Sequence, residues 1–291
     1  MNKGILSGIA AYVLWGLFPI YWKLLHDVPA VQIIGHRILW SFIFLIVIIL
    51  IKKQWRKFYS SVTSFKVFRI YLLASVLLTV NWFIFVLGVN SGRIVETSLG
   101  YFINPIFSVI LGIVFLRERL RLLQWVPVLL AAIGVIYLTV MYGRIPWIAL
   151  SLAFTFGLYG LVKKIAPLDS LYGLTFETAL VFPVTLIYLV FIGINGSGSF
   201  LITDIGTNIL LIGTGVVTSI PLLLFAFAAR NIPLSTVGIL QYIAPSFQFL
   251  IGVIIYKEDF SSSDLTGFSL VWIALLIFSL ESHFSNRKLR A

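Results

Sequence analysis

Three polar side chains, His36, Arg37 and Glu177, stand out because they lie within long apolar stretches of the sequence. Ionisable groups are costly inside a bilayer, so they usually face a partner or a cavity and mark a functional site. Glu177 lies eight residues after Asp169 and Arg37 eight after Pro29, which is about 12 Å along a helix. We expect all three to border a central cavity, with Arg37 and Glu177 close enough to interact in at least one state. A structural ion pair without substrate contact is the alternative.

Two prolines that lie 140 residues apart, Pro105 and Pro245, fall inside apolar stretches. Proline in a helix removes the hydrogen bond to the carbonyl four residues earlier, which here frees the carbonyls of Tyr101 and Gln241. Broken helices of this kind often line transporter sites, and a kink lets a helix bend as a gate. We therefore predict that both prolines kink gating helices, with a static kink that only shapes packing as the alternative.

Further polar and aromatic side chains complete the predicted substrate site. Aromatic rings can stack against an apolar, aromatic or cationic substrate, and an amide facing lipid is unfavourable, although core packing is the alternative for each ring. For Glu96, a carboxylate at the cavity mouth and an i,i+3 ion pair with Arg93 both stay open. The candidates beside the first three are Asn81, Trp82, Tyr101, Asn104, Tyr159, Gln241 and Tyr242, with Trp15 and Glu96 as secondary candidates.

The sequence does not predict a metal, a cofactor or a catalytic nucleophile. It contains no cysteine, its three histidines are scattered, and two acidic residues are adjacent only at Glu258 and Asp259. It has no phosphate-binding loop and no hydrolase motif, so ATP coupling in this chain is not expected. A membrane-embedded enzyme acting on a lipid-linked substrate is the alternative function, but that chemistry normally needs clustered acids or histidines near the membrane surface.

The composition indicates that membrane-spanning helices hold these residues. Of the 291 residues, 60% are hydrophobic and 11% are charged, whereas a soluble domain carries about 25% charged residues. This excludes a water-soluble globular domain and a disordered chain, and it predicts an all-α polytopic membrane protein with ten transmembrane helices. The spans are expected near residues 4–23, 29–51, 70–90, 94–116, 122–142, 145–163, 170–193, 207–229, 233–256 and 265–284.

Lysine and arginine collect on one side of these spans, which predicts their orientation. With the N-terminus inside, the inner segments contain 16 such residues and the outer segments contain 4, while Arg37 alone lies within a span. Cytoplasmic loops carry this excess, so both termini are predicted to be cytoplasmic. We therefore attribute the formal net charge of +11 to the orientation of the chain in the membrane, and no nucleic-acid partner is expected. The aromatic and basic segment 55–69 is expected along the inner membrane surface.

The sequence matches itself at a shift of 140 residues, which predicts two related halves, 1–143 and 144–291. Each half carries five spans, and because five is odd the second half enters the membrane from the opposite side. Such an inverted-topology repeat is a recurrent architecture of secondary transporters. Glu118 and Glu258, which end corresponding helices, are expected to cap or bridge neighbouring segments. Matching positions include Pro105 and Pro245, Gly112 and Gly252, Glu118 and Glu258, and Arg37 and Glu177.

Several stretches spread over nearly the whole chain resemble the EamA family of the drug/metabolite transporter superfamily, and more closely its RarD-type members. The resemblance implies ten helices in two five-helix halves. It also implies carriage of small metabolites, usually outward, by alternating access. The resembling stretches are WGLFPIYWK at 15–23, GHRILWS at 35–41, NW at 81–82, VETSLGYFINP at 95–105, FLRERL at 115–120, FGLYGLVKK at 156–164 and LQYIAPS at 240–246.

Together these features predict a secondary transporter in the bacterial plasma membrane. It is expected to export a small metabolite or drug-like molecule, an amino acid or another small amphipathic or aromatic compound, by alternating access around a midplane cavity. Its partners are then a small-molecule substrate and membrane lipids. Proton coupling through Glu177 or His36 and facilitated diffusion are both open, and the sequence does not indicate an oligomeric state.

Overall fold

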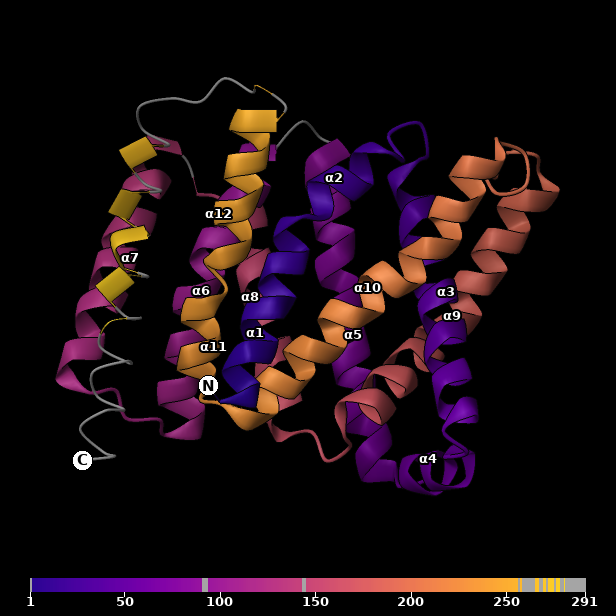
Figure 1. Ribbon diagram of the computed structural model, residues 1–291, viewed down its shortest axis with the longest axis horizontal. Helices are drawn as coiled ribbons and strands as arrows, with labels where there is room; N and C mark the ends of the chain where they lie inside the picture. Colours follow the sequence, from indigo (N-terminus) through magenta and orange to yellow (C-terminus); the bar gives the residue numbers. More distant parts are fainter. Residues whose placement is uncertain are drawn as a thin grey trace.

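The computed structural model describes residues 2–90, 94–142, 145–255 and 257, together with scattered residues between 265 and 280. All regular secondary structure in these residues is helical, as the composition predicts (Figure 1). In chain order the helices are α1 (Lys3–Gly16), α2 (Phe18–Lys23), α3 (Ala30–Ile51), α4 (Trp55–Val62), α5 (Phe65–Asn90), α6 (Ile94–Leu116), α7 (Leu122–Tyr142), α8 (Trp147–Ile165), α9 (Ser170–Ile194), α10 (Ile205–Asn231), α11 (Leu234–Leu240), α12 (Ile243–Leu250) and the π-helical turn η1 (Ile251–Ile255).

Helices lie in the first nine predicted spans, and the tenth, 265–284, falls mostly outside the described residues. Six helical segments are long and apolar enough to cross a membrane: α1 with α2, α3, α5, α8, α9 and α10. The short helix α4 joins α3 to α5 and buries only Phe58, and it lies at their ends in Figure 1. The described part of the chain therefore has the all-helical structure of a polytopic membrane protein.

The first predicted span is divided into two helices at Leu17. Pro19 has no N–H to donate to the carbonyl of Trp15, so an unbroken ladder cannot pass this point. That carbonyl accepts a hydrogen bond from Gln248 Nε2 at 3.2 Å instead. A proline-freed carbonyl thus joins α1 to α12, which is the kind of exchange that lets broken helices persist in an apolar environment.

The longest helix, α10, runs obliquely across the molecule and packs on α1 at one end and α3 at the other (Figure 1). Further strong packing joins α6 to α8 and α11, α3 to α9, and α5 to α8. The largest buried cluster lies where α1, α8 and α10 meet, and it includes Tyr12, Tyr159 and Phe225. Four of the helices named here, α3, α5, α9 and α10, surround the candidate site.

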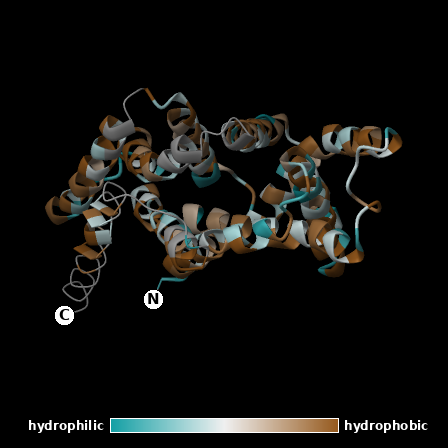
Figure 2. Cartoon of the chain, turned by 90° about the horizontal axis from the view of Figure 1, so that it is seen from above, coloured by the Kyte–Doolittle hydropathy of each residue, from teal (hydrophilic) through white to brown (hydrophobic). Residues whose placement is uncertain are grey.

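The outward faces of the helices are apolar, which suits contact with lipid. Leu122 is 88% exposed and Ile194 is 81% exposed, and large exposed apolar areas are rare on soluble monomers. Seen from above, hydrophobic residues follow helices throughout the chain (Figure 2). Since helices satisfy their own backbone hydrogen bonds, they can present such faces to hydrocarbon.

Candidate functional site

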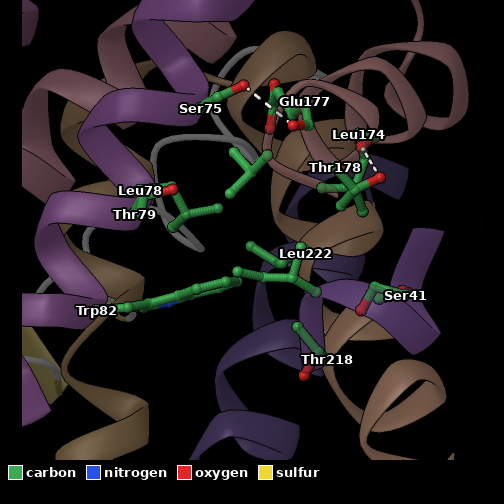
Figure 3. Close-up of a pocket in the computed structure, with 13 residues that line it drawn as sticks. Ser41, Ser75, Leu78, Thr79, Trp82, Leu174, Glu177, Thr178, Thr218 and Leu222 are labelled. Carbon is green, nitrogen blue, oxygen red and sulfur yellow. Dashed lines mark hydrogen bonds between the residues drawn. The ribbon is translucent and has the colours of Figure 1, made fainter. Parts of the chain in front are cut away.

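A partly open cavity lies between α3, α5, α9 and α10, and the space not occupied by atoms there, with the part that is open to the outside included, amounts to about 380 Å³ (Figure 3). Leucine, isoleucine and valine side chains and the ring of Trp82 form its apolar lining. Pockets of this composition, mostly apolar with a few placed polar groups, are typical small-molecule sites. The polar groups are Glu177 and the hydroxyls of Ser41, Ser75, Thr79, Thr178, Thr218 and Ser219.

Three of these six hydroxyls donate to the backbone. Ser75 donates to the carbonyl of Glu177 at 3.1 Å, and Thr178 donates to the carbonyl of Leu174 at 3.0 Å (Figure 3). Ser41 donates to the carbonyl of Gly215 at 3.2 Å. In contrast, Ser219 Oγ is buried without a hydrogen-bond partner. Ser219 therefore offers the cavity a hydroxyl that a substrate or a water molecule can satisfy.

Glu177 lies at one end of the cavity, where its charge is neutralised. Lys163 Nζ is 2.7 Å from Glu177 Oε1, and the hydroxyl of Tyr159 donates to Oε2 at 3.0 Å. All three side chains are at most 2% exposed. The Lys163 ammonium also lies over the rings of Tyr71 and Tyr159, at 5.5 and 5.8 Å from their centroids. Buried charges need this degree of pairing to be tolerated.

The expected ion pair between Arg37 and Glu177 is not formed in this structure. Lys163 was counted with the inner loops from the sequence, but it belongs to the last turn of α8 and turns inward. A long flexible lysine stem can reach a carboxylate from a helix end, so Glu177 is satisfied from α8. The spacing of Tyr159 and Lys163, four residues apart on one helix face, is the signal that indicates this shared site.

Arg37 lies beside the opposite end of the cavity, among residues from three other helices. Its Nε donates to Thr218 Oγ1 at 3.0 Å, and Thr218 is a lining residue. Its guanidinium carbon lies 4.9 Å from the ring centroid of Trp22 and 4.6 Å from that of Trp82. Tyr101 is near enough to interact with it electrostatically. Trp22 and Thr218 were not among the candidates, because residues on α2, α3 and α10 meet only through tertiary packing.

His36 turns away from this cavity, which it was expected to border. It is buried against Phe200, with ring centroids 5.1 Å apart, and it is not among the lining residues. Successive residues of a helix project about 100° apart, so the side chains of His36 and Arg37 leave α3 in different directions. Nδ1 of His36 has no hydrogen-bond partner.

Three candidates from the polar list tie helices together, and a fourth does not. Asn81 donates to the carbonyl of Leu152 at 2.9 Å and to Thr155 Oγ1 at 2.8 Å, which joins α5 to α8. Gln241 donates to Ser108 Oγ at 3.2 Å, and Tyr242 donates to the carbonyl of Phe102 at 3.2 Å, so both join the α11–α12 junction to α6. Asn104, also on α6, is buried with Oδ1 unpartnered.

The two prolines behave differently. Pro245 follows a break, because α11 ends at Leu240 and α12 begins at Ile243. Pro105 lies inside α6, which stays helical from Ile94 to Leu116. The carbonyl of Pro105 approaches Gly238 so closely that a Cβ there would lie 2.7 Å from the oxygen. The broken-helix prediction thus describes the α11–α12 span, whereas α6 accommodates its proline within one helix.

The secondary candidates have separate outcomes. Trp15 packs in the aromatic cluster, 5.6 Å from Phe225 and 5.9 Å from Phe156 between ring centroids. Glu96 belongs to α6, but its side chain and the whole of Arg93 lie outside the described residues. Trp15 does not line the cavity of Figure 3.

The capping role expected of Glu118 is confirmed. Its carboxylate accepts hydrogen bonds from the backbone N–H groups of Leu234 at 2.6 Å and Ser235 at 2.9 Å, and from the hydroxyl of Ser235 at 2.6 Å. These are the first residues of α11, whose N–H groups have no partner within the helix. Glu118 therefore fastens the end of α6 to the start of α11. Glu258 lies outside the described residues.

Comparisons with known proteins match this architecture. The model of the EamA-like transporter family matches residues 2–140. The uncharacterized transporter YojE of Bacillus subtilis is 48% identical over 96% of this chain and 94% of its own length. Protein RarD of Escherichia coli is 40% identical over 99% of this chain and 97% of its own length.

A solved crystal structure of a protein has the same fold, with a TM-score of 0.71 at 15% sequence identity, covering 96% of this chain and 98% of that one. The identities to full-length relatives far exceed what a shared fold requires, and they run from one end of the chain to the other. The chain therefore belongs to the EamA family of the drug/metabolite transporter superfamily, as a RarD-type, multi-pass protein of the bacterial inner membrane.

Proposed function

We propose that this protein is a secondary transporter that exports a small metabolite by alternating access around the cavity between α3, α5, α9 and α10. The observation that carries the proposal is the position of this cavity, within the apolar part of four long helices and with Arg37 and Glu177 beside opposite ends. Relatives with this sequence pattern are named as transporters. A small amphipathic or aromatic compound, such as an amino acid, suits the mixed lining.

Alternating access rests on two inverted halves, 1–143 and 144–291, and the helix boundaries support this division. The helices α3, α5 and α6 begin at residues 30, 65 and 94, while α9, α10 and α11 begin at 170, 205 and 234. Each start is repeated 140 residues later. The family model matches residues 2–140, so its match coincides with the first half of the chain.

Packing between these helices supports the same division. A Cβ added to Gly16 of α1 would collide with Phe247 of α12, and one added to Gly157 of α8 would collide with Phe107 of α6. Phe107 and Phe247 are counterparts at the shift of 140, and Gly16 and Gly157 at 141. The helix α6 thus packs on α8 as α12 packs on α1, which is the relation that a pseudo-two-fold axis in the membrane plane produces.

Backbone conformation at the ends of the matched helices adds a further observation. Arg117 and Lys257 both have a φ of 54°, in the left-handed region that residues with a Cβ rarely adopt. They are counterparts at the shift of 140. After Arg117, the N–H of Glu118 bonds to the carbonyl of Gly112 at 3.1 Å, which closes the end of α6.

Flux through proteoliposomes tests this function. We expect saturable transport of at least one member of a panel of labelled amino acids and small aromatic amines and acids. The variant Thr79→Phe fills the cavity and should abolish it, whereas Thr63→Phe, at the exposed end of α4, should not. Flux equal in both variants would contradict the proposal. Repeating the assay with a pH gradient distinguishes proton coupling from facilitated diffusion.

A further inference from the structure

Arg37 is a half-buried cation within the membrane-spanning part of the chain, and among the described residues it has no counter-charge. In the described residues, the carboxylate of Glu177 is paired with Lys163, and no carboxylate forms an ion pair with Arg37. The indole rings of Trp22 and Trp82 stabilise the guanidinium through their quadrupoles but supply no negative charge. An uncompensated cation in a low-dielectric region is unfavourable unless a ligand balances it.

The hydrogen-bonding edge of Arg37 is also largely unused. Only Nε has a partner, the hydroxyl of Thr218 at 3.0 Å. The two terminal nitrogens have no hydrogen-bond partner within the described chain, and neither is among the fully buried polar atoms that lack one. They therefore keep accessible surface. A guanidinium with a free terminal edge matches the planar, two-oxygen geometry of a carboxylate.

The rest of the cavity supplies no second charge that is free to bind substrate. Lys163 and Glu177 neutralise each other, and Tyr159 completes the carboxylate's hydrogen bonds. Arg37 contacts Trp82 and Thr218, and both of these side chains line the cavity. Among the described residues, Arg37 is therefore the one charge beside the cavity that is not neutralised, which favours a ligand with one negative charge.

We propose that the substrates of this transporter are small organic acids, and that Arg37 binds their carboxylate through its terminal nitrogens. This inference rests on the proposed transport function and names its substrate class. The apolar body of the acid lies along Trp82 and the leucine side chains of the cavity. A zwitterion binds more weakly than the corresponding acid, because its ammonium group finds no free carboxylate, and a simple amine binds weakest.

Equilibrium binding to the purified protein in phosphatidylcholine nanodiscs tests the proposal without requiring transport. The probes are 3-phenylpropionate, phenylalanine, 3-phenylpropan-1-ol and 2-phenylethylamine, which share a phenyl body and differ in charge. We expect 3-phenylpropionate to bind about tenfold or more tightly than the alcohol, since hydrogen bonds to charged groups contribute about 1.5–3 kcal/mol. Equal or tighter binding of the amine or the alcohol would overturn the proposal, as would no binding of the acid.

Substitutions at Arg37 locate the effect. Arg37→Gln should weaken 3-phenylpropionate binding by about 10- to 100-fold and leave alcohol binding unchanged, whereas Arg37→Lys should retain part of the acid preference. Alcohol binding also reports that each variant is folded. The matched control is Arg69→Gln, because Arg69 likewise lies over an aromatic ring, that of Phe65, but on an exposed face of α5. An equal loss in Arg69→Gln would contradict a role for Arg37.

The two proposals fail in different ways. If 3-phenylpropionate binds through Arg37 but proteoliposomes carry no substrate, the transport function is wrong and the acid site stands. If proteoliposomes carry amines or neutral compounds equally well in wild type and Arg37→Gln, transport stands and the acid assignment is wrong.

Discussion

The two ends of the cavity present a contrast within one scaffold. Arg37 and Glu177 are counterparts at the 140-residue shift, and both lie beside the same cavity. Glu177 is held by Lys163 at 2.7 Å, while Arg37 is held by the ring of Trp22 at 4.9 Å. At the shift of 141 that aligns the first helices, Trp22 is the counterpart of Lys163. This one position therefore holds a lysine that pairs with Glu177 in the second half, and a tryptophan that gives Arg37 no ion pair in the first half.

This difference separates a structural charge, Glu177, from the charge that we propose binds the substrate, Arg37. An ion pair with all its hydrogen bonds made stabilises a particular helix arrangement, here that of α8 and α9, but offers nothing to a ligand. A cation stabilised by aromatic rings keeps its hydrogen-bonding edge free. Repeated helices can thus share their packing while the substituted side chains decide which half recognises the substrate.

The largest expected effect comes from breaking the ion pair between Lys163 and Glu177. Lys163→Met leaves the Glu177 carboxylate buried without its counter-ion, and removing one partner of a buried pair costs about 3–5 kcal/mol. Chemical or thermal unfolding in nanodiscs measures the loss. The double variant Lys163→Met with Glu177→Gln should recover much of it. If the single variant is as stable as wild type, the pair is not structural, and the contrast with Arg37 disappears.

Overpacking the matched helix contacts compares the halves themselves. Gly16→Leu and Gly157→Leu each force a side chain into a neighbouring phenylalanine, and overpacking costs about 1–3 kcal/mol. We expect similar losses of unfolding free energy in the two variants. Gly193→Leu serves as a control, because nothing lies within 4 Å of a Cβ at that position. A large cost in only one half would contradict equivalent packing.

A substitution that gives Arg37 an ion-pair partner sharpens the contrast between the two ends of the cavity. Trp22→Glu places a carboxylate beside Arg37, where the second half has an ion pair. The new pair should compete with an organic acid and weaken 3-phenylpropionate binding about tenfold, which corresponds to about 1.4 kcal/mol. Titration of the nanodisc-bound protein measures this change. Trp22→Gln is the matched control, and an equal loss in both variants would assign the effect to the missing indole.

The smallest expected effect concerns the helix cap that joins α6 to α11. Glu118→Gln keeps the side chain's shape but removes its charge from the helix N-terminus and replaces one of its two accepting oxygens with an NH2 group, a combined loss of about 1 kcal/mol. Unfolding measurements on Glu118→Gln and on its counterpart, Glu258→Gln, compare the two halves. Similar losses would extend the cap to the second half, while an unaffected Glu258→Gln would restrict it to Glu118.

Much of the fold could be predicted because hydropathy is a local property of the chain. Apolar stretches of about 20 residues must form helices in lipid, and helices occupy the first nine predicted ranges. The capping role of Glu118 was also predictable, since a carboxylate at a helix end has few other uses in an apolar chain. The depths of Arg37 and Glu177 followed from counting residues within their spans.

The partners of these charges could not be predicted, because they depend on which helix faces meet. Lys163 looks like a loop residue until α8 packs beside α9, and its long stem then reaches Glu177. His36 and Arg37 are neighbours in sequence, yet helical geometry sends them to Phe200 and Thr218.

By itself, the sequence determined that this protein spans the membrane with several helices and has few charged residues within its apolar stretches, and it showed that the chain matches itself at a shift of 140 residues. Periodicity and composition are properties of the linear sequence, so they can be read without a three-dimensional structure. Only the tertiary structure decided that, among the described residues, Glu177 is neutralised by Lys163 and Arg37 has no carboxylate partner. That outcome depends on distances of a few ångströms between α2, α3, α8, α9 and α10, which packing alone sets.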